Sequence, residues 1–297
     1  MSASPKQSTN QIMVMEPKNF HANPQTKSTN SYQHEDDKDI TDIHNNAVGE
    51  FRAMRDLLVR HGIIMTTTLG QEGCPDDIFC NNWVSTHAGG RMVLYPMLAD
   101  NRKTERRPEL IEMLGKIYTD VQDYSDQESN NKSLESTGAM CLDRVNRIAY
   151  QNRSSRSDEE VAALWCRNND YTHVPFDTQH KGKPVYHADV VMWIGTEIAG
   201  VCSECVVSDH LIQDLNKHRA VIEFTNDQMQ AFCGNSLEVV GADGERMLVM
   251  SNSGYESLRE DQKDLLDNYY KTIIKPVIPT IEYYGGGSAR CMLLELF

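Results

Sequence analysis

The sequence of 297 residues lacks the features that mark several common classes of protein. It has no run of about 18 apolar residues, the length that a membrane-spanning helix needs. Lys and Arg are few, 29 against 43 Asp and Glu, and the net charge of −14 opposes contact with nucleic-acid phosphates. The first residues also lack the apolar core of a secretory signal. We therefore expect a cytoplasmic protein that binds neither membranes nor nucleic acid.

Cofactor and metal motifs are also scarce. No Gly-x-Gly-x-x-Gly follows a predicted strand, so no dinucleotide fingerprint is present. Eight cysteines are scattered along the chain, and only Cys202 and Cys205 have the spacing of a metal or redox pair. A four-cysteine zinc site needs a second such pair. We expect no metal and no organic cofactor, and keep a zinc or redox protein as an alternative.

The apolar pattern predicts one large α/β domain behind a short tail. Residues 1–9 are small and polar, which is typical of a flexible segment. Over residues 10–297 a unit of strand, turn, strand, helix and strand recurs at a spacing of about 50 residues, a period typical of propeller blades. The pattern fits a propeller of mixed α/β blades, and an ordinary α/β sheet fits nearly as well.

The same spacing predicts individual elements. The polar stretch 19–46 is expected to be a surface loop or a lid near a site. A helix is expected to open at Ser157, with Glu160 completing a capping box. Other expected elements are a strand over 11–15, helices over 48–60 and 256–270, and strands over 190–194 and 278–283.

Cys291 is the first candidate for chemistry because it follows Gly285-Gly286-Gly287-Ser288. A thiolate is a strong nucleophile, and the N–H groups of flexible glycines can face a developing negative charge. The alternative is an inert buried thiol, since Met292 and the leucines after it are apolar. Cysteine statistics alone favour that alternative, and the glycine run narrows the difference.

A base and carboxylates come from two other segments. His187 and Asp189 precede an apolar run, which places them at the expected mouth of a strand and on one face of it. A histidine there can protonate a departing amine and later deprotonate water. Glu135 can orient that imidazole as the third member of a Cys/His/acid set. The alternatives are a histidine bonded at a strand end and a solvated or capping glutamate.

The segment from Pro75 to Trp83 gathers acids, amides and an aromatic, which suits a polar ligand with several N–H donors. Asp77 and Asn82 are its candidate ligands. The alternative is a well-bonded turn that leads into a strand.

Five strings, DDIFCNNWVSTH, VLYPMLADNRKTERR, DRVNRIAY, PVYHADVVMWIGTE and GGGSARCMLLELF, resemble the guanidino-group-modifying (pentein) superfamily. This superfamily includes arginine deiminases, dimethylarginine dimethylaminohydrolases and amidinotransferases, and the likeness is greatest to its amidinotransferase-like, citrulline-utilisation hydrolase branch. It covers residues 11–297 and implies a five-bladed α/β propeller of repeated strand-strand-helix-strand units. It also implies Cys291 as nucleophile, His187 as general acid/base, Glu135 as its partner and Asp189 as a ligand of the guanidinium.

Two departures from the superfamily pattern bear on the substrate. Asn82 stands where many deiminases carry an aspartate, and a neutral ureido group tolerates an amide there better than a cationic guanidinium does. Asp77 is an alternative source of the second negative charge. Ser136 stands where a glycine is usual, which affects the setting of Glu135.

The resemblance therefore implies a cysteine-dependent hydrolase of a non-peptide C–N bond in a citrulline- or arginine-like amino acid, without metal or cofactor. Amidino transfer to an amine acceptor and a catalytically silent binding protein are the alternatives. Arginines that can pair with the substrate's carboxylate are Arg102, Arg106, Arg107, Arg144 and Arg147. We expect a small amino-acid substrate as the partner and leave a homo-oligomer open.

Overall fold

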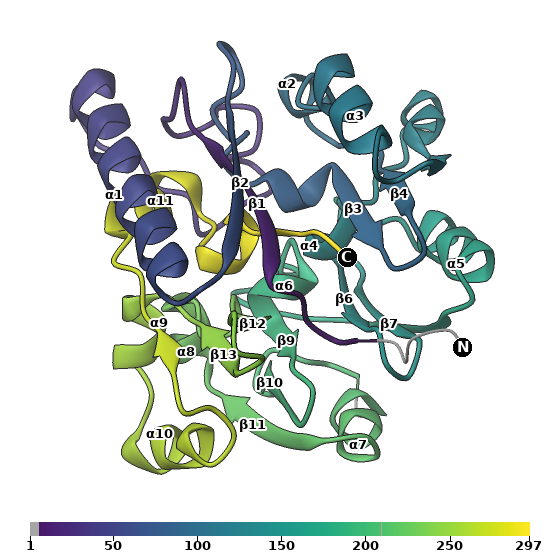
Figure 1. The fold of residues 1–297 in the computed structure, drawn as a ribbon, viewed down its shortest axis with the longest axis vertical. Helices are drawn as coiled ribbons and strands as arrows, with labels where there is room; N and C mark the ends of the chain where they lie inside the picture. Colours follow the sequence, from purple (N-terminus) through teal and green to yellow (C-terminus); the bar gives the residue numbers. More distant parts are fainter. Residues whose placement is uncertain (1–5, 209) are drawn as a thin grey trace.

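The computed structural model describes residues 6–208 and 210–297, and its strands form five three-stranded sheets (Figure 1). In each sheet the central strand pairs antiparallel with one neighbour and parallel with the other. Four sheets follow one another along the chain: β3 (Val84–His87), β4 (Arg91–Leu94) and β5 (Asp120–Asp123); β6 (Met140–Asp143), β7 (Ile148–Asn152) and β8 (Thr172–Phe176); β9 (Met192–Ile194), β10 (Ile198–Cys202) and β11 (Ala220–Phe224); β12 (Leu237–Val240), β13 (Arg246–Val249) and β14 (Ile273–Ile274). The chain is thus an α/β protein with repeated small sheets, as predicted.

The fifth sheet joins the two ends of the chain. β15 (Leu294–Glu295) pairs antiparallel with β1 (Gln11–Glu16), which pairs parallel with β2 (Ile64–Leu69). In Figure 1 the dark purple β1 lies beside the yellow C-terminal segment. The sheet repeats the topology of the other four, although its strands come from distant parts of the sequence.

The last residues of the predicted tail are anchored. Gln7 is buried, and its side-chain amide donates to Leu142 O and Ile194 O at 2.9 and 3.2 Å. The Thr9 hydroxyl donates to Leu296 O at 2.7 Å. The prediction of a flexible tail over residues 1–9 is therefore wrong at its end, because these polar side chains complete bonds of three sheets; residues 1–5 lie outside the described residues.

The helices connect the strands or precede them. The helices are α1 (Ile40–Arg60), α2 (Asp100–Lys103), α3 (Pro108–Gly115), α4 (Ser136–Ala139), α5 (Glu159–Asn168), α6 (Ala188–Val191), α7 (His210–Asn216), α8 (Asn226–Gln230), α9 (Asn252–Glu256), α10 (Glu260–Asp267) and α11 (Pro279–Gly285), with 3-10 turns η1 (Cys80–Asn82), η2 (Ser125–Asn130) and η3 (Ala289–Met292). No helix in the described part of the chain is long and apolar enough to cross a membrane.

Several predicted helices begin elsewhere because capping groups decide their ends. Asp39 accepts from Thr41 N and starts α1 at Ile40 rather than at residue 48. Asp158 accepts from the N–H groups of Glu160 and Val161, so it replaces the predicted capping box. The predicted helix 256–270 is two helices, α9 and α10.

Two predicted strands contain helical turns. Residues 278–283 form the start of α11, with Pro279 at its first position, where the missing N–H costs nothing. Residues 188–191 form α6 before β9 begins at Met192. Short apolar runs do not separate a buried strand from a buried helical turn, which explains both errors.

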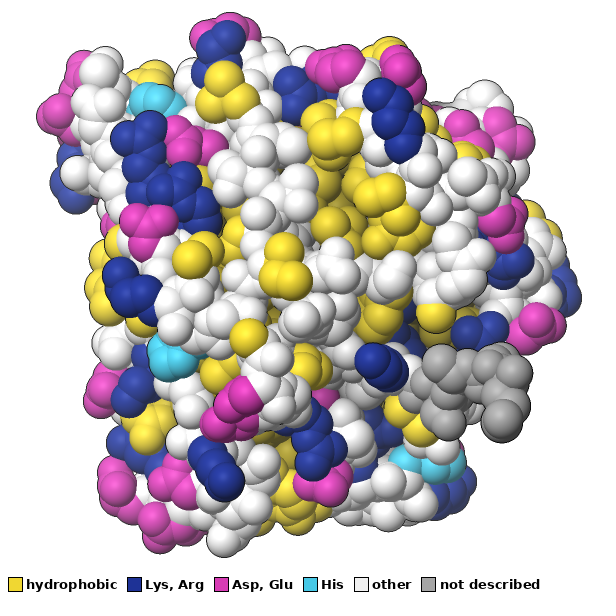
Figure 2. All heavy atoms as spheres, viewed as in Figure 1, with side chains coloured by type: hydrophobic (Ala, Val, Ile, Leu, Met, Phe, Trp, Pro, Cys, Tyr) yellow, Lys and Arg dark blue, Asp and Glu magenta, His cyan; other side chains and the backbone are white. Residues whose placement is uncertain are grey.

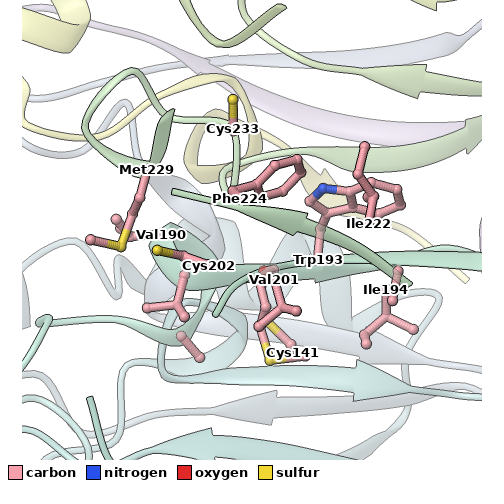
Figure 3. Close-up of a cluster of buried hydrophobic side chains, with 14 of the residues drawn as sticks. Cys141, Val190, Trp193, Ile194, Val201, Cys202, Ile222, Phe224, Met229 and Cys233 are labelled. Atoms are coloured by element: carbon pink, nitrogen blue, oxygen red, sulfur yellow. Dashed lines mark hydrogen bonds between the residues drawn. The ribbon is translucent and has the colours of Figure 1, made fainter. Parts of the chain in front are cut away.

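The largest apolar cluster packs around β9, β10 and β11. Figure 3 shows Val190, Trp193, Val201, Cys202 and Phe224 in it, with the Cys202 sulfur among apolar side chains. On the outer face in Figure 2, Lys and Arg side chains are interspersed with Asp and Glu.

Candidate active site

Short helical turns that precede the inner strands bring the candidate residues together. η1, α4, α6 and η3 lead into β3, β6, β9 and β15. α4 contacts both η1 and α6, and η1 contacts η3. These turns carry or adjoin Asn82, Glu135, Asp189 and Cys291, so the repeat places segments that are distant in sequence at one point.

The Cys291 loop is set by a glycine and a serine. Gly286 has φ +61°, and a Cβ there would lie 2.6 Å from Gln33 N, so only glycine fits without a shift of the chain. The Cys291 N–H donates to Ser288 O at 3.1 Å, and the Ser288 hydroxyl donates to the buried Glu282 carboxylate at 2.5 Å. The loop therefore presents the cysteine in a fixed position.

The Cys291 thiol has two polar neighbours. It donates to Asp189 Oδ2 at 3.4 Å, and Asn235 Nδ2 donates to its sulfur at 3.0 Å. Asn235 Oδ1 also accepts from the Cys291 N–H at 3.3 Å. Burial and the negative charge of Asp189 raise the pKa of Cys291 well above its usual value, so the free protein holds it as a thiol. The sequence analysis missed Asn235, whose cue is its place just before the first strand of the fourth sheet.

His187 and Glu135 form a buried pair. The His187 Nε2 and Glu135 Oε2 atoms are 2.8 Å apart, and both side chains are about 1% exposed. Burial raises the pKa of Glu135, but the charges of Arg156 and Arg102, at 3.6 and 3.7 Å, and the bond from His187 outweigh it and hold that pKa well below its usual value. Glu135 therefore stays ionised beside the imidazole.

His187 reaches Asp189 by a different geometry from the one predicted. It caps α6, and Asp189 lies in the first turn of that helix, so the two are not on one strand face. His187 Nδ1 is nevertheless 3.9 Å from Asp189 Oδ1, and within the described chain Nδ1 has no hydrogen-bond partner. Burial raises the pKa of Asp189. The free nitrogen is available to a bound molecule.

Ser136 takes a backbone conformation that favours glycine. Its φ is +45°, which costs a residue with a Cβ roughly 1 kcal/mol or more. Its hydroxyl donates to Val84 O at 3.2 Å, a bond that a glycine cannot make. The departure from the superfamily glycine thus leaves the backbone turn beside Glu135 in place.

A cavity of about 10 Å³ joins these groups. It is lined by Asn30, Asp76, Phe79, Asn82, Arg102, Arg156, Tyr186, His187, Gly285, Gly287 and Cys291. This volume holds about one water molecule, whereas a bound amino acid needs a few hundred Å³. The structure is therefore a closed state.

Asp77 does not line this cavity, and its neighbour Asp76 does. Asp77 Oδ2 accepts from Gln71 N at 2.7 Å, and burial raises its pKa to about 8. Asp76 Oδ2 accepts from Asn23 Nδ2 at 2.8 Å and from the Thr26 hydroxyl at 3.2 Å. The acidic pair in the sequence thus divides between the cavity and a turn.

Among the arginines named from the sequence, Arg102 alone lines the cavity. Arg106 pairs with Glu128 at 2.7 Å, and Arg144 pairs with Glu295 at 3.3 Å. Arg156, which the sequence analysis missed, lines the cavity and lies over the Tyr186 ring. Nothing in its local sequence marks it, because its neighbours are serines.

Residues 20–39, here called the cover, lie over the cavity without forming a helix or strand. Asn30 Nδ2 donates to Gly285 O and Gly286 O, each at 3.2 Å. Arg156 donates to Thr29 Oγ1 at 2.7 Å. The cover thus reaches both the cysteine loop and the arginine, which fits the predicted lid.

The Cys202 and Cys205 pair lies elsewhere, buried in the cluster around β10. In the described residues no group of three or more His, Cys, Asp or Glu side chains has a geometry that can hold a metal ion. The sequence alternative of a zinc site has no further ligand there.

The comparisons with known proteins agree with this site. The family model for eukaryotic N,N dimethylarginine dimethylhydrolase matches residues 16–297. The chain belongs to that family, and with it to the pentein superfamily that its motifs predict. No curated protein matches the sequence.

Several solved structures share the fold at low sequence identity. The N-terminal domain of ArgZ bound to substrate, an arginine dihydrolase of Cyanobacteria, is 15% identical with a TM-score of 0.76, covering 96% of this chain and 97% of that one. Unliganded AgrE is 17% identical with a TM-score of 0.77, over 97% and 39% of the two chains. A dimethylarginine dimethylaminohydrolase adduct with 4-chloro-2-hydroxymethylpyridine is 18% identical with a TM-score of 0.68, over 96% and 99%.

Proposed function

We propose that the protein is a cysteine-dependent hydrolase that cleaves a C–N bond in the guanidino or ureido group of an arginine- or citrulline-like amino acid. The observation that carries this is the shared cavity of Cys291 and His187, with Glu135 behind the imidazole. Family membership and the arginine-directed relatives named above support the same class of reaction.

The reaction has two steps. The Cys291 sulfur bonds to the central carbon of the substrate, one C–N bond breaks, and the leaving nitrogen takes a proton from His187, whose loss the thiol proton replaces. Water, deprotonated by His187, then attacks the same carbon, and the C–S bond breaks as the sulfur regains a proton. Glu135 stabilises the imidazolium in both steps, and Asp189 faces the substrate's N–H groups.

Binding of substrate favours the first step if it brings N–H donors to Asp189. The carboxylate now accepts from the Cys291 thiol and raises its pKa. Donors that replace the thiol proton at Asp189 lower the cost of forming the thiolate. Asp76 and Arg156, at the rim of the cavity, are the groups of opposite charge proposed for the amino and carboxylate end of the substrate.

We also propose that the five sheets close into a five-bladed propeller around this site. The inner strand β9 contacts both β6 and β12, and β15 contacts β3. These contacts follow the order of blades in a ring.

Product analysis by mass spectrometry tests the function. Wild type, Cys291→Ser and the matched control Cys74→Ser are incubated with citrulline, arginine, methylated arginines and agmatine. We expect ornithine from citrulline, or citrulline from an arginine, in wild type and Cys74→Ser only. Absence of turnover together with absence of a covalent adduct on Cys291 would refute the hydrolase.

Amidino transfer is the second candidate, and the closed cavity under the cover favours it because transfer requires that water be excluded. Adding primary amines to the same incubations distinguishes the two. A transferase forms an amidino-amine product that depends on Cys291, whereas the hydrolase yields the same products with or without the amine.

A further inference from the structure

The Asn82 carboxamide has a defined orientation. Its Oδ1 atom accepts from Arg102 Nη1 at 2.9 Å. A guanidinium has only donors, so the atom that faces it must be the oxygen and not the nitrogen. The Nδ2 group of Asn82 therefore points away from Arg102.

Arg102 is itself held by a buried carboxylate. Its Nε donates to Glu105 Oε1 at 2.7 Å and its Nη2 donates to Glu105 Oε2 at 3.1 Å, a two-point contact that fixes the plane of the guanidinium. Nη2 also donates to Phe79 O at 3.2 Å. Arg102 is 2% exposed and Glu105 is 1% exposed. The arginine cannot turn without leaving Glu105 unpaired in the interior.

The free end of the Asn82 carboxamide faces the reacting groups. Asn82 Nδ2 is buried, and the described chain offers it no hydrogen-bond partner. A Cβ built on Gly138 would lie 2.4 Å from this nitrogen and 2.7 Å from His187 Nδ1, so both nitrogens adjoin the same glycine. The site therefore presents an N–H donor beside the general acid.

Acceptors complete the set. Asp189 Oδ1 and Asp76 Oδ1 are also buried, and neither has a partner among residues 6–208 and 210–297. A guanidinium brings only N–H donors, so it satisfies the carboxylates and leaves the Asn82 N–H without an acceptor, which is costly in a buried site. A ureido group brings N–H donors and one carbonyl oxygen, and it satisfies both.

We propose that Arg102 and Glu105 are positioning residues that orient the Asn82 carboxamide, and that this orientation selects a ureido group over a guanidino group at the reacting carbon. The inference rests on the proposed function, because it names the substrate class of the same site. Asn82 donates to the ureido oxygen, and the negative charge that this oxygen gains during attack by Cys291 strengthens the bond.

The test is the ratio of kcat/KM for citrulline to kcat/KM for arginine. It is measured for wild type, Asn82→Asp, Arg102→Lys and Glu105→Gln, with Glu109→Gln as the matched control because Glu109 lies on α3 with its side chain 66% exposed. Circular dichroism and thermal unfolding establish that each variant is folded. Asn82→Asp keeps the size of the side chain and its bond to Arg102, so it decides the question if Glu105→Gln fails to fold.

We expect wild type to favour citrulline and Asn82→Asp to lower the ratio on the order of a hundredfold, since an acceptor replaces the donor. Arg102→Lys and Glu105→Gln lower the ratio about tenfold, and Glu109→Gln leaves it unchanged. A merely structural role of the pair lowers both rates equally and leaves the ratio as it is.

Two failures are distinguishable. If wild type turns over either substrate and the ratio stays within about threefold in folded Asn82→Asp and Glu105→Gln, the positioning role is wrong and the hydrolase stands. If wild type turns over neither substrate and Cys291 forms no adduct, the proposed function fails and this inference fails with it.

Discussion

The floor of the site and its cover are built in different ways. The floor, η1, α4, α6 and η3, consists of short turns that each lead into a strand, so the repeated sheets fix its geometry. The cover, residues 20–39, lies between β1 and α1 and is held by side-chain bonds from Asn23, Asn30 and Arg156. The chemistry therefore depends on the repeat, whereas access depends on one irregular segment.

The largest expected effect is on the floor. Glu135→Gln removes the charge that stabilises the His187 imidazolium, and we expect kcat to fall on the order of a thousandfold. Arg156 and Arg102 lose a carboxylate 3.6 and 3.7 Å away, so the variant also unfolds at lower temperature. Steady-state kinetics and calorimetry measure the two effects.

The matched control is Glu160→Gln, whose carboxylate is 82% exposed beside Lys132. It should change neither kcat nor the melting temperature, because exposed ion pairs contribute little. A Glu135→Gln enzyme with a kcat within tenfold of wild type would show that the imidazole needs no charged partner.

The next effect is steric. Gly138→Ala places a methyl group 2.4 Å from Asn82 Nδ2 and 2.7 Å from His187 Nδ1, and both side chains are held from behind. We expect kcat to fall about a hundredfold, as misplacement of a reacting group by about 1 Å can cause.

Gly49→Ala in α1 is the control for that substitution, since nothing lies within 4 Å of its Cβ. It should leave kcat unchanged and stabilise the helix by roughly 0.5–1 kcal/mol. Equal activity of the two alanine variants would mean that the floor is softer than its packing indicates.

This contrast also explains what the sequence predicts well. The floor follows a repeat, and hairpins such as β6–β7 announce themselves by apolar runs around a turn at Asp143. Cys291 and His187 stand at the matching place in their units, so motif and period point to them together. Asn235 occupies the same place in the fourth unit but lies in no recognised string.

The cover and its partners are less predictable because their contacts are single long-range bonds. Arg156 meets Thr29 across 127 positions, and no local pattern encodes that pairing. Asp76 and Asp77 are adjacent in the sequence, yet a tight turn sends one to the cavity and the other to Gln71. Composition predicted an acidic ligand in this segment without deciding which residue supplies it.

A smaller effect is expected from the cover. Asn30→Ala removes two bonds to the cysteine loop, so the closed state loses stability and KM for the substrate should rise about tenfold. We expect kcat to change less than KM. Hydrogen exchange should quicken over residues 20–39 and stay slow over 136–139.

Asn45→Ala, at an exposed position of α1, is the control and should show none of these changes. If Asn30→Ala instead lowers kcat with KM unchanged, the asparagine acts through the Cys291 loop, and the division between floor and cover fails at this point.

The smallest effect concerns Asp77, beside the floor but outside the cavity. Its pKa is about 8 in the folded protein and about 4 in an unfolded chain. Between these pH values the unfolded chain loses the proton and the folded one keeps it, so this group makes stability fall as pH rises from 4 to 8. Asp77→Asn removes that dependence and keeps an acceptor for Gln71 N. We expect its melting temperature to match wild type near pH 4 and to exceed it by about 2–4 °C at pH 8, with Asp267→Asn, exposed at the end of α10, unchanged throughout. A difference that does not grow with pH would mean that Asp77 is ionised in the folded protein, and activity should be unaffected either way because Asp76, not Asp77, faces the substrate.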